Sequence, residues 1–276
     1  MPHADAPSRP SCLRYVALGD SQTEGLGDGD DLVGTRGFAD RLAERLAAVD
    51  PAVRYANLAV RGRLAGQVRA EQLGPALDLR PDLATVVAGV NDLLRPRFDA
   101  AEAAGHLEAM FAALTAAGAR VATVTFPDMA ELTPLARPLR PRIEELNRLI
   151  RAAAARHGVV VADTAGHTVV ADPRIWSPDR LHASPLGHER IAAAIAHALA
   201  LPGADASWSL PLPAPNAPAP TGARAVAAEL RWAAAFLGPW LGRRLRGRSS
   251  GDGRVAKRPH LLPVSPPTAV DASATP

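Results

Sequence analysis

Residues of three types that act together in nucleophilic catalysis stand far apart in this sequence. Ser21 follows an apolar run over residues 15–18 and the pair Gly19-Asp20, whereas Asp179 and His182 lie much later in the chain, separated by only two residues. A serine hydroxyl is a weak nucleophile unless a base takes its proton and hydrogen-bond donors receive the developing oxyanion. Because one loop can hold both Asp179 and His182 and aim the imidazole at Ser21, the pattern predicts acyl transfer from an ester or thioester carbonyl.

The run that ends at Ser21 is typical of a buried strand that stops at a glycine turn, at the edge where open α/β sheets bind ligands. Strand-like and helix-like segments alternate from there to about residue 200. Strands are predicted over 54–60, 83–89, 120–126 and 159–162, and helices over 38–49, 67–79, 100–118, 142–157 and 186–199. This alternation predicts an α/β fold: a three-layer α/β/α sandwich of the flavodoxin-like kind, with a central parallel sheet of about five strands.

Four blocks carry a resemblance to a known family. Gly19-Asp20-Ser21, residues 59–62, residues 89–92 and the segment 177–182 occur in the order seen in the SGNH hydrolases, also called the GDSL family of esterases and lipases. The similarity covers about residues 14–200. It implies a catalytic triad of Ser21, His182 and Asp179, and an oxyanion hole formed by the N–H groups of Ser21 and Gly62 and the side-chain amide of Asn91.

Other candidate residues are weaker. Asp163 and Asp172 compete with Asp179 for the role of the acid, but they are too distant from His182 in sequence for one turn to hold them. His188 and His197 fall within a predicted helix, and no Cys or His cluster has zinc spacing, so we expect no metal and no cofactor. The acidic, glycine-rich segment 22–31 departs from the calcium-loop pattern, and we expect it to be a mobile loop at the mouth of the site.

The substrate stays open at this level, because a fold does not fix a substrate. A serine acyl hydrolase of the esterase, lipase or thioesterase type fits the motifs, and an O-deacetylase of a carbohydrate or small metabolite is an alternative. A third alternative, of another class, is a catalytically idle binding module on the same fold. The four blocks contain the residues that the chemistry needs, Ser21, Gly62, Asn91 and His182. Their presence speaks against an idle binding module.

Composition sets broader limits. The chain has 276 residues, of which 47% are hydrophobic, with a single cysteine and a net charge of +3. One cysteine allows no intrachain disulfide, and the polar start of the chain lacks the apolar segment of a secretion signal, so we expect a cytoplasmic protein. Residues 1–202 carry a net charge of −2 and residues 203–276 a net charge of +5. A nearly neutral body does not indicate a nucleic-acid partner.

The sequence divides into four parts. Residues 1–202 form the predicted SGNH hydrolase domain, 203–222 a Pro/Ala-rich linker, 223–248 an amphipathic helical extension, and 249–276 a disordered tail. Two interpretations of the helix compete. It packs against the catalytic domain or a second subunit, or it adsorbs weakly to an anionic membrane surface. The oligomeric state cannot be read from the sequence.

Overall fold

The computed structural model describes residues 13–214, 222–239, 242 and 249–265. In these residues one central sheet has the strand order β7-β6-β5-β1-β4-β8, and its first five members are parallel. The strands are β1 (Arg14–Gly19), β4 (Arg54–Asn57), β5 (Leu83–Val87), β6 (Arg120–Val124), β7 (Val160–Ala162) and β8 (Arg258–Pro263). β1 lies inside the sheet and is buried along nearly all of its length, as its uninterrupted apolar run requires.

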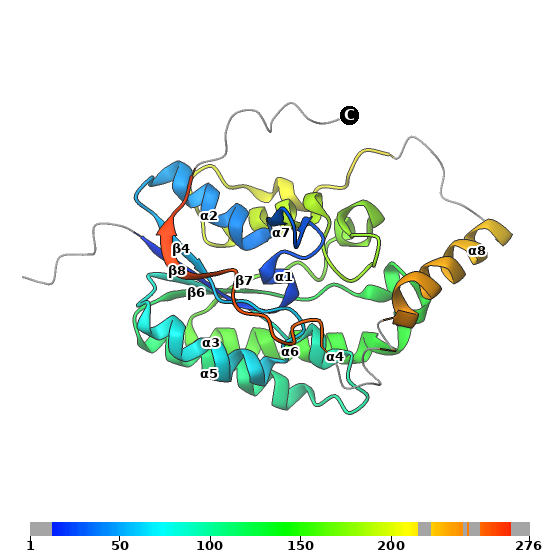
Figure 1. Ribbon diagram of the computed structural model, residues 1–276, viewed down its shortest axis with the longest axis horizontal. Helices are drawn as coiled ribbons and strands as arrows, with labels where there is room; N and C mark the ends of the chain where they lie inside the picture. Colours follow the sequence, from blue (N-terminus) through cyan, green and yellow to red (C-terminus); the bar gives the residue numbers. More distant parts are fainter. Residues whose placement is uncertain (1–12, 215–221, 240–241, 243–248, 266–276) are drawn as a thin grey trace, which may run out of the picture.

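Helices cover both faces of the sheet, and Figure 1 shows α2 and α7 on one side and α3, α5 and α6 on the other. These helices are α2 (Phe38–Val49), α3 (Ala65–Asp78), α5 (Ala100–Ala116), α6 (Arg140–His157) and α7 (Pro185–Ala198). The expected three-layer α/β/α sandwich with a parallel sheet is therefore confirmed. Its single large hydrophobic core lies between the sheet and the two helical layers.

Local chemistry explains where several of these helices begin and end. The Ser184 hydroxyl accepts a hydrogen bond from Gly187 N–H at 3.2 Å, and Pro185 occupies the first turn of α7, where a missing N–H costs nothing. Asp99 caps α5 in the same way. Gly158 ends α6 in the left-handed conformation, with φ of 65°.

The segment expected to be a mobile loop, residues 22–31, instead begins with the short helix α1 (Ser21–Glu24) and continues into a hairpin of β2 (Gly29–Asp30) and β3 (Gly34–Thr35). The connection between β6 and α6 contains the 3-10 turns η1 (Met129–Glu131) and η2 (Pro134–Leu139). Further 3-10 turns between β7 and α7 are η3 (Thr168–Ala171) and η4 (Pro173–Ile175).

The linker expected over 203–222 begins later than the composition indicates. Residues 206–209 form the turn η5 (Ala206–Ser209), and Trp208 within it is buried in the main core. Its ring contacts His167 edge-on, with 4.5 Å between the centroids. The aromatic side chain thus attaches this stretch to the catalytic domain, while residues 215–221 lie outside the described part of the chain.

The expectation of a disordered tail over 249–276 is wrong for residues 249–265. Residues 258–263 form β8, which pairs antiparallel with β4, and residues 249–257 cross the molecule before it (Figure 1). We call residues 249–263 the C-terminal strap. A Pro-containing strand fits this place because an edge strand uses only one side of its backbone for pairing. Residues 266–276 lie outside the described part.

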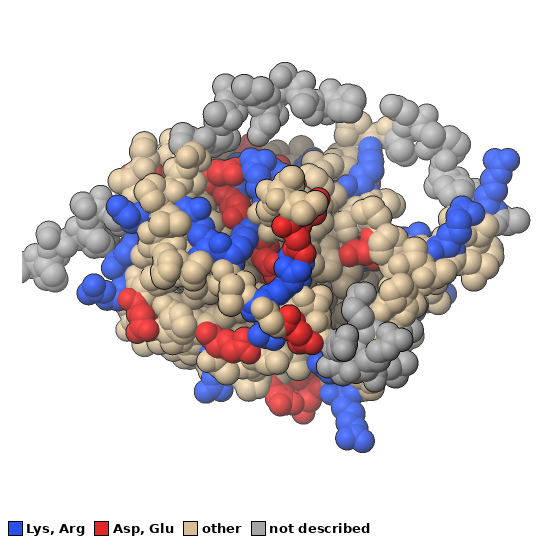
Figure 2. All heavy atoms as spheres, in the orientation of Figure 1, with Lys and Arg blue, Asp and Glu red and all other residues tan. Residues whose placement is uncertain are grey.

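Ion pairs attach the strap to the surface that it crosses. Arg254 pairs with Asp31 at 2.5 Å, and Lys257 pairs with Asp40 at 2.6 Å. Figure 2 shows basic and acidic side chains interleaved on this face of the molecule. The basic excess of the C-terminal part is therefore used in part to bind acidic residues of the same chain.

The helical extension expected over 223–248 is helical where it is described. It consists of α8 (Gly222–Trp232), followed by a single π-helical stretch, η6 (Ala233–Leu237). Figure 1 shows α8 at the periphery of the molecule. None of the helices within the described residues has the length and apolar character needed to cross a membrane.

Candidate active site

The backbone around Ser21 brings its hydroxyl to the carboxyl edge of the sheet. β1 ends at Gly19, Asp20 caps α1, and Ser21 is the first residue of that helix, with 9% of its surface exposed. Gly19 has φ of 157°, and a Cβ there would lie 2.3 Å from both the Thr23 hydroxyl and the carbonyl oxygen of Val87. The tight strand-to-helix turn therefore requires glycine, and it leaves the N–H of Ser21 outside the bonding pattern of the helix.

Ser21, His182 and Asp179 form a continuous chain of hydrogen bonds. His182 Nε2 lies 2.8 Å from Ser21 Oγ, and His182 Nδ1 lies 2.6 Å from Asp179 Oδ2. A carboxylate only accepts, so Nδ1 carries the proton and Nε2 is left to accept from the Ser21 hydroxyl. The structure thus brings together the three residues that the sequence singled out, with the imidazole oriented as a general base.

Asp179 is held by several donors at once. Its Oδ1 accepts hydrogen bonds from Ser177 Oγ at 2.6 Å, Leu181 N–H at 2.9 Å and His182 N–H at 3.0 Å. Burial opposes ionisation, but the hydrogen bonds and charge of His182 outweigh it and hold the pKa of Asp179 well below its usual range. We call residues 177–182 the Asp-His turn. Its carboxylate stays ionised and able to stabilise an imidazolium throughout the neutral range.

Asn91 reaches the site from the end of the neighbouring strand β5. It lies in the short helix α4 (Val90–Leu93), which follows Gly89 at φ of 121°. Its amide nitrogen donates to the Asp20 carboxylate at 3.2 Å and to the Arg63 carbonyl at 3.1 Å. These two contacts place the carboxamide beside the residue that precedes Ser21.

Burial raises the pKa of Asp20 from an ordinary 3.8 to about 7, against the opposing effects of the Gln22 N–H bond and the charge of His182. Asp20 is only 2% exposed, so desolvation dominates. No pattern in the sequence marks this carboxyl as a group with a shifted pKa, because its burial arises only when the site is assembled.

Gly62 lies in the turn after β4, at φ of 77°. Arg61, which precedes Gly62, binds Glu24 of α1 in two ways. Its N–H donates to the Glu24 carboxylate at 2.6 Å, and its guanidinium forms an ion pair with the same carboxylate. This pair links the Gly62 turn to the helix that begins at Ser21. On its outer side Gly62 is covered by the C-terminal strap, where a Cβ on Gly62 would lie 2.1 Å from Ser249 Oγ.

The profile of the GDSL-like lipase/acylhydrolase family matches residues 17–190, well over half of the chain. The chain belongs to the GDSL-like lipase/acylhydrolase family. As a GDSL-family protein it is a hydrolase of ester bonds. No curated protein matches the chain as a whole or in part.

Solved structures share the fold of this GDSL-family hydrolase. An α/β hydrolase, LAE5, from the metagenome of Lake Arreo, Spain, is 23% identical with a TM-score of 0.57, and the match covers 68% of this chain and 95% of that one. An acetylxylan esterase, Axe2, from Geobacillus stearothermophilus is 19% identical with a TM-score of 0.59, covering 70% and 97%. A lipase/acylhydrolase from Enterococcus faecalis is 24% identical with a TM-score of 0.55, covering 67% and 94%.

The other candidates of the sequence have different partners in this GDSL-family fold. Asp163 pairs with Arg151 at 2.8 Å, and Asp172 pairs with Arg174 at 2.6 Å. His188 is fully buried, where its Nδ1 accepts from the Phe38 backbone N–H at 3.1 Å. In the described part of the chain, no three His, Cys, Asp or Glu side chains gather in a way that could hold a metal ion.

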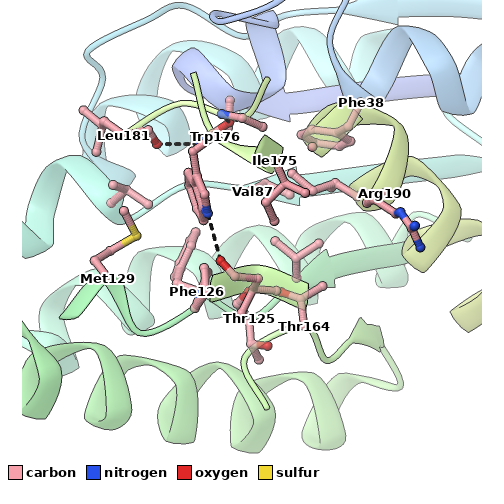
Figure 3. A pocket seen from close by; sticks show the side chains of 18 of the residues that line it. Phe38, Val87, Thr125, Phe126, Met129, Thr164, Ile175, Trp176, Leu181 and Arg190 are labelled. Atoms are coloured by element: carbon pink, nitrogen blue, oxygen red, sulfur yellow. Dashed lines mark hydrogen bonds between the residues drawn. The ribbon is translucent and has the colours of Figure 1, made fainter. Parts of the chain in front are cut away.

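A partly open cavity of about 110 Å³ lies in this hydrolase beside the residues of the site, and Figure 3 shows side chains around it. Gln22 and Leu181, which follow Ser21 and precede His182, both line it. Most of the remaining lining is apolar and comes from both helical layers, the strand ends and η1 to η5. Examples are Phe38, Val87, Phe126, Met129, Ile175, Trp176 and Trp208.

The polar side chains in the cavity wall have partners within the protein. Gln22 Nε2 donates to the Leu181 carbonyl at 2.9 Å, Trp176 Nε1 donates to the Val170 carbonyl at 2.8 Å, and Thr125 Oγ1 donates to Asp163 at 2.7 Å. The binding free energy of a group in the cavity would therefore come more from burial of apolar surface than from new hydrogen bonds. The shape of this cavity has no counterpart in the sequence, because its lining comes from many separate segments.

Proposed function

We propose that this GDSL-family hydrolase cleaves carboxylic esters through Ser21, His182 and Asp179, and that it favours substrates with an apolar acyl group. The observation that carries the proposal is the hydrogen-bond chain from Ser21 Oγ through the imidazole to Asp179, at 2.8 and 2.6 Å. Nucleophile, base and orienting acid are then within reach of one another before substrate binds.

The reaction would proceed in two steps. Ser21 Oγ attacks the ester carbonyl while its proton passes to His182 Nε2, and the tetrahedral intermediate collapses as the imidazolium returns that proton to the leaving alcohol. Water then attacks the acyl-enzyme with the same base, releasing the acid and restoring Ser21. Asp179 stabilises the imidazolium in both steps and keeps its own charge.

The negative oxygen of each tetrahedral intermediate would be bound by the N–H groups of Ser21 and Gly62 and by the Asn91 amide. Two features support this assignment. Ser21 begins a helix, where N–H groups are unused, and Asn91 is anchored through Asp20, the neighbour of Ser21. The short helix and the anchored amide would present donors without reorganisation during the reaction.

The cavity supports an apolar acyl group as the preferred substrate over an acetylated sugar. Each methylene buried in such a cavity contributes about 0.8 kcal/mol, which corresponds to roughly a fourfold gain in kcat/KM if the gain is kept in the transition state. The threonine and glutamine groups in the wall already have partners, so the wall offers little to sugar hydroxyls.

A panel of p-nitrophenyl esters tests the proposal. We expect kcat/KM to rise from acetate through butyrate to hexanoate, and we expect Ser21→Ala to abolish turnover while the fold is retained. A fluorophosphonate probe should label Ser21, located by peptide mass spectrometry. Turnover that survives in Ser21→Ala would refute the nucleophile, and a preference for acetylated xylo-oligosaccharides over every p-nitrophenyl ester would refute the acyl preference.

A further inference from the structure

Helix α8 contacts the catalytic domain at a residue inside the Asp-His turn. Arg180, which directly follows Asp179, directs its guanidinium Nη1 to both carboxylate oxygens of Glu229, at 2.6 and 2.8 Å. The same guanidinium lies over the ring of Trp232, 4.8 Å from its centroid. Two side chains one helical turn apart on α8 thus bind one cation on the turn that carries His182.

Glu229 also connects this turn to the chain segment between β6 and α6. Its Oε2 accepts a hydrogen bond from the Thr133 hydroxyl at 3.4 Å, between η1 and η2. The contacts are partly shielded from water, because the Arg180 and Glu229 side chains are 26% and 37% exposed. An ion pair that combines two carboxylate contacts with a cation–π contact holds one geometry better than an isolated surface pair does.

The backbone of Arg180 explains why the turn needs such support. Arg180 has φ of 56°, in the left-handed region that side chains with a Cβ adopt at a cost. Its N–H donates to the Ser177 carbonyl at 2.9 Å, and Ser177 N–H donates to the His182 carbonyl at 2.8 Å. A change in the backbone of Arg180 would therefore move Asp179, which precedes it, and His182, two residues later in the same closed turn.

We propose that Glu229 and Trp232 are positioning residues, which hold Arg180 in its left-handed conformation and so keep His182 aligned with Ser21. This inference rests on the proposed function, because it assumes that the alignment is used in catalysis. It assigns α8 a role in activity although this helix lies outside the residues that match the family, 17–190. The C-terminal extension is then required for full catalytic activity.

The test compares single variants in the full-length protein. Glu229→Ala and Trp232→Ala should lower kcat for p-nitrophenyl butyrate by roughly five- to tenfold, with KM changed less than about twofold, because positioning of the base affects the transition state. The rate of fluorophosphonate labelling at Ser21 should fall in parallel. The control is Leu230→Ala, at a position 66% exposed on the same helix, which should leave both rates unchanged.

A double-mutant cycle separates positioning from general destabilisation. Arg180→Gly removes the guanidinium that Glu229 binds, and glycine adopts a positive φ without strain. Glu229 then has nothing to position. Adding Glu229→Ala to Arg180→Gly should therefore change kcat less than about twofold. An equal loss of kcat in both backgrounds would overturn the inference, as would unchanged kcat in Glu229→Ala and Trp232→Ala. If the wild-type protein is not labelled at Ser21, the proposed function fails instead.

Discussion

The buried carboxyl of Asp20 predicts a measurable pH dependence of the free energy of unfolding. Its carboxyl is buried beside Ser21 and accepts from the Asn91 amide at 3.2 Å, and burial raises its pKa from 3.8 to about 7. In the folded protein Asp20 keeps its proton up to about pH 7, whereas in the unfolded chain it releases that proton near pH 4. The folded state therefore binds more protons between these values, and its stability falls as the pH rises through this window.

The size of the effect follows from the same two values. At 1.36 kcal/mol per pH unit, the difference between 3.8 and about 7 corresponds to about 4 kcal/mol, all of it present below pH 4 and lost above pH 7. Asn at position 20 stays neutral throughout. We expect the free energy of unfolding of Asp20→Asn to match that of the wild type near pH 4 and to exceed it by about 4 kcal/mol at pH 8.

Urea denaturation followed by circular dichroism at several pH values measures this difference. Titrating groups distant from Asp20 contribute equally to both proteins, so they cancel when the two free energies are subtracted. Asp78→Asn, at an exposed position, is the matched control and should leave the free energy of unfolding within about 0.5 kcal/mol of the wild type at both pH values. A difference between Asp20→Asn and wild type that is the same at pH 4 and pH 8 would refute the reasoning.

Three further predictions concern the donors and the buried histidine. Asn91→Ala should lower kcat by about a hundredfold, or about 3 kcal/mol of transition-state stabilisation, with little change in Tm; unchanged p-nitrophenyl ester kinetics would exclude Asn91 from the oxyanion hole. Gly62→Ala should lower both Tm and kcat, because its φ is 77° and its Cβ would lie 2.1 Å from Ser249 Oγ. Adding Ser249→Gly should recover part of the Tm, measured by thermal denaturation, and no recovery would show that the strap does not constrain Gly62. Burial lowers the pKa of His188 from 6.5 to about 4, so the wild type should lose about 3 kcal/mol of stability as the pH falls through that window. His188→Gln should lack this loss in urea denaturation, and an identical pH dependence in both proteins would contradict the assignment.

The sequence by itself determined most of the fold and the closeness of Asp179 to His182. Apolar runs such as residues 15–18 and 83–87 report burial on both faces, which is why parallel interior strands could be predicted. Asp179 and His182 are close in sequence, so a single turn aligns them whatever the rest of the chain does. Local patterns of this kind need no knowledge of distant partners.

Only the tertiary structure decided the features that join distant segments. β8 pairs with β4 across about 200 residues, and its sequence Arg258–Pro263, with two prolines, has no strand signature. The pairing of Arg180 with Glu229, the pKa of Asp20 and the shape of the cavity likewise depend on which groups meet in space. The physical reason is that residue types record whether a group tends to be buried or charged, whereas its partner and the dielectric around it exist only after the chain has packed.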